Sequence, residues 1–247
     1  MHPHTGLQTV SWLFNGEVEH RDSLGSVQKV RPGELNIMTA GIGIAHSELS
    51  TNNRSTLHGV QLWTVLPDQH RNMEPSFDHY NDLPVFNWRD MGIRLFVGEF
   101  LEHASPAKIF SPMMGAEVDL PPGLVTEIPV DPSFEYGLLV VSGQATVNGK
   151  LVQLGQLHYL PAGKDGLVLS STTGAKLIFL GGEPFREQIL MWWNFVARSY
   201  DEIQQMREDW QNQGSRFPAF QDRIGGRIPA PPLPNVKLRP RGNPSKE

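Results

Sequence analysis

Two pairs of potential metal ligands in this chain share one spacing. His2 and His4 are separated by a single residue, and His46 and Glu48 are separated in the same way. Because successive side chains of a β-strand point to opposite faces, each pair would lie on one face of its strand. Three imidazoles and one carboxylate from neighbouring strands could hold one divalent ion and leave coordination positions free, as a catalytic metal requires. One His-x-His pair is weak evidence, but two pairs of equal spacing favour a metal site.

The segment between the two pairs is predicted to consist of short strands and turns. Residues 9–14 are β-branched or aromatic, and the Asn15-Gly16 dipeptide that follows is a strong hairpin signal. Residues 31–34 have the composition of a turn, and residues 35–38 are predicted to form another short strand. No part of the segment has a helical period, so an all-β meander or barrel is expected.

The chain also contains an internal repeat. Residues 30–41 align without gaps with residues 152–163, which indicates that the same barrel unit occurs twice. Extending this alignment places His2, His4, His46 and Glu48 opposite Pro129, Asp131, Val168 and Ser170, in that order. A single aspartate among apolar partners cannot hold a first-row metal ion. We therefore expect the second barrel to have no metal site.

A helix is predicted after the second barrel. Ser199 and Glu202 are three residues apart, as in a capping box, and Ile203, Met206 and Trp210 would follow on one helix face. Before this helix, residues 189–197 are predicted to form a last buried strand.

Three parts are expected along the chain. Residues 1–110 would form a metal-binding barrel, and residues 111–224 a second barrel without metal, closed by the helix. Residues 225–247 would form an extended or disordered tail, because the proline-rich run at 229–234 suits neither a sheet nor a helix.

Composition excludes several classes of protein. The chain has 247 residues and no cysteine, which rules out disulfides, thiolate metal ligands and thiol catalysis. A net charge of -5 argues against direct nucleic-acid binding. Neither a long apolar run nor a signal peptide is visible, so we expect a cytoplasmic protein without membrane contact.

Four blocks of sequence carry a resemblance to a known family. They are residues 2–6, residues 20–25, residues 38–41 together with residues 46–48, and residues 58–63. In order and spacing they resemble the signature blocks of the pirin family, within the cupin superfamily. The resemblance implies a bicupin, two tandem cupin β-barrels, with non-haem iron in the first. By this resemblance the iron ligands are His2, His4, His46 and Glu48.

The chain departs from the family pattern at two points near the expected metal site. Pirins carry about fifty residues before the His-x-His block, so the first barrel would lack strands here and the edge beside His2 would fray. Gln8 stands where many members have Glu, and an amide can hydrogen-bond a ligand or water but cannot act as a base.

The resemblance also implies an activity. Bacterial pirins resemble quercetin 2,3-dioxygenases, which open the heterocyclic ring of flavonols with O₂ and release carbon monoxide. Glu48 would then take the proton of the substrate hydroxyl. The expected cofactor is Fe(II), for which Mn, Co, Ni, Cu or Zn could substitute in such a ligand set. The expected partners are a flavonol-like aromatic substrate and O₂.

Two alternatives stay open at this level. Eukaryotic pirins resemble metal-dependent cofactors of transcription factors, which would have a protein partner and no turnover; a non-redox cupin activity such as isomerisation is weaker. An apolar cavity beside the metal would favour the enzyme, and an exposed patch the regulator. His20 and His58 lie in signature blocks and could orient a ligand or a substrate, or serve in ordinary packing.

Overall fold

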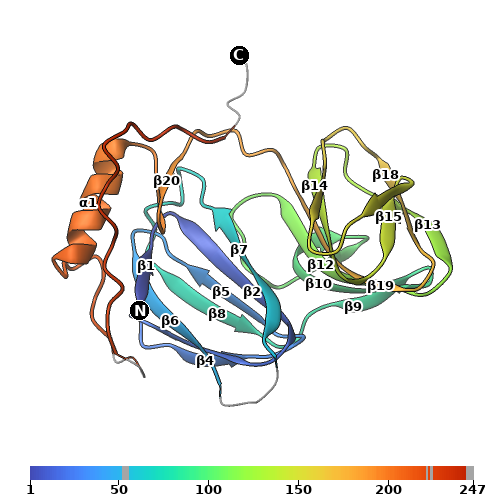
Figure 1. Cartoon of the computed structure of the whole chain (residues 1–247), viewed down its shortest axis with the longest axis horizontal. Helices are drawn as coiled ribbons and strands as arrows, with labels where there is room; N and C mark the ends of the chain where they lie inside the picture. Colours follow the sequence, from blue (N-terminus) through green and yellow to red (C-terminus); the bar gives the residue numbers. More distant parts are fainter. Residues whose placement is uncertain (52–55, 221, 223–224, 243–247) are drawn as a thin grey trace. The chain divides into compact units, whose positions relative to one another are not determined.

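Short antiparallel strands make up most of the computed structural model, which describes residues 1–51, 56–220, 222 and 225–242. The chain divides into two compact units. One contains Met1–Asn81 with Phe185–Glu247, and the other contains Asp82–Pro184 (Figure 1). Each unit holds one barrel made of two sheets, which confirms the prediction of an all-β protein with two barrels. Among the described residues, no helix is long and apolar enough to cross a membrane.

Two four-stranded sheets form the first barrel. One sheet has, in spatial order, β1 (His2–His4), β6 (Ile44–Ser50), β3 (Val18–Asp22) and β4 (Val27–Val30). The other has β7 (His58–Val65), β2 (Leu7–Asn15), β5 (Leu35–Thr39) and β8 (Ser76–Tyr80). Leu13 of β2 packs against Val18 of β3 and Val30 of β4, so apolar side chains join the two sheets.

The local predictions for this barrel are confirmed. Strands β2 and β5 cover the two segments that were predicted from their β-branched and aromatic composition. Gly16 has a φ of 91°, a conformation that glycine adopts without strain, and β2 ends at the turn that contains it. The local sequence therefore sets where these strands end.

The second barrel also has two sheets. The larger contains β9 (Val85–Trp88), β10 (Met91–Phe100), β11 (His103–Ala104), β12 (Met113–Leu120), β19 (Ala175–Gly182), β14 (Glu135–Gly143) and β17 (Leu157–Leu160). The smaller has, in order, β13 (Leu124–Pro129), β18 (Gly166–Ser171), β15 (Ala145–Val147) and β16 (Lys150–Val152). Its interior is one apolar cluster that includes Leu138, Leu167 and Phe179.

The internal repeat is visible in the strand order. The order β1-β6-β3-β4 in the first barrel corresponds to β13-β18-β15-β16 in the second. The order β7-β2-β5 corresponds in the same way to β19-β14-β17. The aligned segments 30–41 and 152–163 contain β5 and β17, which occupy equivalent places.

The boundaries between the units differ from those expected at residues 110 and 224. Strands β9 and β10 pair with each other, and β10 pairs with β12, so the second unit already begins at Asp82. At its other end the second unit stops at Pro184, and everything after it belongs to the first. Strand pairing and packing decide these boundaries, and neither is readable from composition.

The segment after the second barrel forms a hairpin and then a helix. The single strand expected at 189–197 is in fact two, β20 (Leu190–Trp192) and β21 (Phe195–Ala197), joined through Trp193 with a φ of 51°. Helix α1 (Tyr200–Gln211) begins with the predicted capping box of Ser199 and Glu202. Its buried face, Ile203, Met206 and Trp210, is also as predicted.

Helix α1 packs on the first unit. This corrects the expectation that it would close the second barrel. Its buried face shares one apolar cluster with Phe195 of β21 and Ala45 of β6. Because β6 carries two of the candidate ligands, the helix supports the strand on which they lie.

The described part of the tail is extended and docked. Trp210 Nε1 donates a hydrogen bond to the Ile228 carbonyl at 2.9 Å, and the Ile228 amide donates to the Met1 carbonyl at 2.9 Å. Figure 1 shows the tail running beside α1 and past the N-terminus. Farther along, the Val196 amide donates to the Thr5 carbonyl at 3.2 Å. Hydrogen bonds therefore hold the main chain at both ends of β1, which corrects the expectation that this edge would fray.

Candidate metal centre

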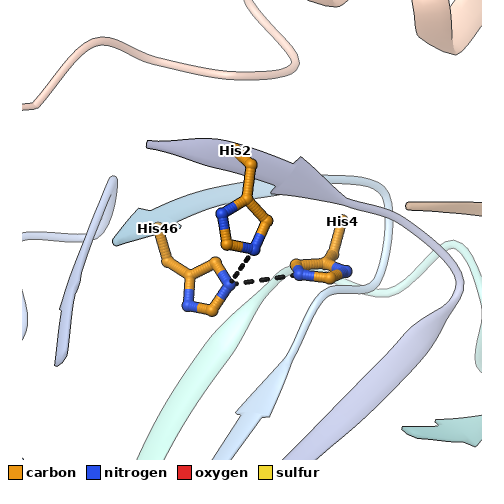
Figure 2. A group of neighbouring side chains, drawn as sticks. All are labelled: His2, His4 and His46. Atoms are coloured by element: carbon orange, nitrogen blue, oxygen red, sulfur yellow. Dashed lines mark hydrogen bonds between the residues drawn. The ribbon is translucent and has the colours of Figure 1, made fainter. Parts of the chain in front are cut away.

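Strand register brings the candidate ligands to one place inside the first barrel. His2 of β1 lies directly opposite His46 of β6, while His4 lies two residues along on the same face. On the other side of β6, Glu48 lies opposite His20 of β3. The period of two along each strand therefore turns the His2, His4 and His46 side chains toward one another (Figure 2).

Three ring nitrogens converge on one point. The Nε2 atom of His46 lies 2.9 Å from Nε2 of His2 and 3.1 Å from Nε2 of His4 (Figure 2). Two nitrogens that bind one ion at about 2.1 Å, at right angles, would lie about 3 Å apart. The observed separations therefore suit a shared divalent ion.

The charge state of these rings also suits a metal ion. His4 and His46 are fully buried. Burial, with the neighbouring imidazoles adding to it, lowers the pKa of His4 and of His46 well below the ordinary value of 6.5. Burial lowers the pKa of His2 as well. Neutral imidazoles with free Nε2 lone pairs are the form that binds metals.

Glu48 lies beside this cluster but is held by other residues. Its Oε2 accepts a hydrogen bond from Gln61 Nε2 at 2.6 Å, and its Oε1 accepts a longer one from Ser11 Oγ at 3.4 Å. Burial alone would raise the pKa of Glu48, but the nearby His20 ring and the hydrogen bond from Gln61 lower it below its ordinary value. The carboxylate is therefore ionised at neutral pH.

The potential ligand atoms form two overlapping groups. One group joins His2, His4 and His46, and the other joins His20, His46 and Glu48. His46 belongs to both, so the four residues proposed from sequence are brought together around it. The sequence left open whether His20 orients a ligand or only packs in the core. The structure places its ring at the candidate site.

Two other residues singled out from the sequence lie elsewhere. His58 is exposed, and its ring packs on Phe14 with centroids 5.1 Å apart. Gln8 is buried between strands, where its Nε2 donates to Thr39 Oγ1 at 2.9 Å. Its amide therefore joins β2 to β5.

Two aromatic rings lie beside the cluster, and of these only Trp63, in the block of residues 58–63, was singled out from the sequence. Trp63 lies edge-on to His4 with ring centroids 5.1 Å apart, and Phe77 stacks on His20 at 4.2 Å. Both rings come from the sheet that faces β1 and β6. Only the closing of the barrel places these side chains against the histidines.

An apolar pocket opens beside Glu48. It has a volume of about 250 Å³ and is walled by Leu13, Val18, Val30 and Val60, with Ser11 and Gln61 as its polar lining. A mainly apolar cavity with a few polar groups is the usual form of a small-molecule site.

The ligand positions have apolar counterparts in the second barrel. The cross-strand pair of Val18 and Val30 in the first barrel corresponds to the pair of Ala145 and Val152 in the second. Following the pairing to the next strand, Leu49 of β6 corresponds to Ser170 of β18. His2, His4, His46 and Glu48 therefore correspond to Ile128, Val130, Leu167 and Leu169, all of them buried.

This register corrects the one expected from sequence by one residue. The gapless alignment chose Val168, which is 40% exposed, because it carried one fixed register from β17 into β18. A shift of one residue moves every side chain to the opposite face of its strand. Asp131, one of the expected counterparts, is exposed and accepts hydrogen bonds from Ser133. The second barrel has aliphatic side chains where the first has the candidate ligands.

Two cupin barrels, of which the first alone holds a histidine cluster among the residues that the structure describes, define the class of this protein. The model of the Pirin family matches residues 1–64, and the model of the Pirin C-terminal cupin domain matches residues 115–218. The chain belongs to the pirin family.

Its relatives support this assignment over nearly the whole chain. A Pseudomonas aeruginosa protein named "Putative quercetin 2,3-dioxygenase" is 43% identical over 235 residues, which cover 94% of this chain and 74% of the relative. A pirin-like protein of Caulobacter vibrioides is 33% identical, covering 88% of this chain and 76% of the relative.

A solved structure is similar as well. The quercetin 2,3-dioxygenase of Acinetobacter baumannii has 41% identity and a TM-score of 0.92, covering 96% of this chain and 80% of that one. A bacterial pirin of Escherichia coli solved with nickel(II) shares the fold, with a TM-score of 0.61 and 21% identity over 74% of this chain and 76% of that one.

Proposed function

We propose that this protein is a metal-dependent dioxygenase that opens the heterocyclic ring of a flavonol-type substrate with O₂. The observation that carries the proposal is the convergence of three neutral imidazoles beside an ionised carboxylate that lines an apolar pocket. Similar proteins that bear the name quercetin 2,3-dioxygenase support the choice of substrate class.

The proposed metal is Fe(II), held by His2, His4, His46 and Glu48. Buried neutral imidazoles with one carboxylate fit this ion, and they would also accept Mn, Co, Ni, Cu or Zn. Bound there, the metal would supply Lewis acidity to a substrate hydroxyl and a place for O₂.

Glu48 is the proposed base. Gln61 occupies Oε2 through a short hydrogen bond, whereas Oε1 has longer contacts, with Ser11 Oγ at 3.4 Å and with His20 Nδ1 at 3.8 Å. The substrate proton would therefore pass to Oε1. General bases of this kind contribute about 10²- to 10⁴-fold to a rate.

The apolar walls of the pocket favour an enzyme over a regulatory protein. Leu13, Val18, Val30 and Val60 would exclude water and pack against a flat aromatic ring. A metal-sensing regulator would instead need an exposed patch around the ion.

The test is flavonol turnover by the iron-loaded protein. Quercetin absorbance and released carbon monoxide would be followed under air and under argon, with metal-free protein as the control. The proposal expects loss of quercetin and release of carbon monoxide only with both iron and O₂. Equal consumption under argon, or none by fully loaded protein in air, would refute it.

A further inference from the structure

His20 links a carboxylate to one of the candidate ligands. Its ring is buried and stacked on Phe77 at an interplanar angle of 14°. Its Nε2 lies 3.0 Å from Asp22 Oδ2, while its Nδ1 lies 3.5 Å from Nδ1 of His46. One ring therefore bridges Asp22 and the ring nitrogen of His46 that faces away from His2 and His4.

Asp22 is itself held in place by the turn that follows it. Its Oδ1 accepts hydrogen bonds from the amides of Leu24 at 2.9 Å and Ser26 at 3.0 Å. This arrangement leaves Oδ2 for His20. An ionised carboxylate can only accept hydrogen bonds, so the single proton of a neutral His20 must be on Nε2. The Nδ1 atom of His20 is then an acceptor.

Of the two polar side chains that the described residues place beside that nitrogen, only one can donate. Glu48 Oε1, which lies 3.8 Å from the same nitrogen, is also an acceptor. The donor is therefore the Nδ1 proton of His46, which leaves the lone pair of His46 on Nε2. That nitrogen faces the Nε2 atoms of His2 and His4. By contrast, Nδ1 of His4 has no hydrogen-bond partner among the residues the structure describes.

We propose that Asp22 and His20 are positioning residues that fix His46 in its Nδ1-protonated tautomer and so keep its Nε2 lone pair ready for the metal ion. The expected effect on metal binding rests on the proposed metal site. The tautomer itself is a property of the metal-free protein. Partners of this kind typically change metal affinity by about 10- to 100-fold when they are removed.

The first variant is Asp22→Asn. The asparagine oxygen can still accept from Leu24 and Ser26, but its amide would donate to His20 Nε2 and shift the proton of His20 to Nδ1. His46 would then lose its acceptor and move toward the Nε2-protonated tautomer. Imidazole ¹⁵N chemical shifts of the metal-free protein, at a pH where the rings are neutral, report this change directly.

The second variant, His20→Phe, keeps an aromatic ring against Phe77 and removes both ring nitrogens. Fe(II) affinity, measured under argon by competition with a chromophoric chelator, should fall about 10- to 100-fold in either variant. If Asp22 acts through His20, Asp22→Asn should cost almost nothing further in the His20→Phe background. Glu19→Gln, a neighbour on β3 that faces away from His20, is the matched control and should change neither readout.

The outcomes separate this inference from the proposed function. Nε2-protonated His46 in the unmodified protein, or unchanged ¹⁵N shifts and unchanged Fe(II) affinity in Asp22→Asn, would overturn the inference. Additive losses in the double variant would also overturn it, since Asp22 would then act independently of His20. The expected shifts together with absent flavonol turnover would sustain the inference and reject the proposed activity alone.

Discussion

His2 and His46 are direct cross-strand partners, and their Nε2 atoms lie 2.9 Å apart inside the first barrel. His46 also belongs to the group that contains Glu48 and His20, whereas His2 belongs only to the group of three imidazoles. His46 therefore connects the two groups of potential ligands, whereas His2 contributes to one of them.

The first prediction follows from this inequality. His46→Ala should abolish iron binding with the fold intact, and His2→Ala should weaken it less, because His2 is only partly buried and joins a single group. Elemental analysis of purified variants measures the metal, and circular dichroism checks the fold. His58→Ala, which changes an exposed ring on Phe14, is the control. Full iron content in His46→Ala would rule out this assignment.

The second prediction concerns Glu48. Glu48→Gln keeps the shape of the side chain and removes the base, so flavonol turnover should fall about 10²-fold or more. Steady-state rates at equal iron loading measure the effect. Glu34→Gln, in a turn away from the pocket, should be neutral. An unimpaired Glu48→Gln protein would remove Glu48 from the proton transfer.

The third prediction concerns the second barrel. It has aliphatic residues at the positions that correspond to the candidate ligands, so metal binding should saturate at one ion per chain. Asp131 is exposed, and Asp131→Ala should leave the metal content unchanged. Titration with Fe(II) under argon gives the stoichiometry. Two tightly bound ions per chain would show that the correspondence between the barrels is mistaken.

The fourth prediction tests the packing of that barrel. Leu138 is fully buried, so Leu138→Asp would place an unpaired charge in the apolar core and should lower the free energy of unfolding by more than about 4 kcal/mol. Val125 of β13 is 72% exposed, and Val125→Asp should cost far less. Urea unfolding of both variants makes the comparison, and equal losses would contradict it.

The fifth prediction concerns pH. Because the pKa values of buried His4 and His46 are lowered, these rings stay neutral in the folded state while the unfolded chain takes up protons below about pH 6.5. The metal-free protein should therefore lose stability as the pH falls from about 7.5 to 5.5, by up to about 1.4 kcal/mol per pH unit for each ring. His20, whose pKa is raised, opposes this trend in part.

Urea unfolding across that pH range measures the slope. His4→Gln removes one of the three histidines with a lowered pKa and should make the slope shallower. A free energy of unfolding that rises on acidification in this window would contradict the burial argument.

The sequence alone determined the local features of this protein. Strand segments, the Asn15-Gly16 turn and the Ser199 capping box depend on residues close together in the chain, whose conformational preferences act without the rest of the fold. The same is true of the pairing of His2 with His4 and of His46 with Glu48, since a period of two needs only a strand.

The tertiary structure decided what meets across strands. Cross-strand register depends on loop lengths and on which face is buried, and the expected counterparts in the second barrel were therefore displaced by one residue. His20 reached His46 through the pairing of β3 with β6. Ser47 Oγ donates to Asp222 Oδ1 at 2.8 Å, although the two residues are 175 positions apart. Contacts over such separations arise from the packing of the whole first unit, and no local preference specifies them.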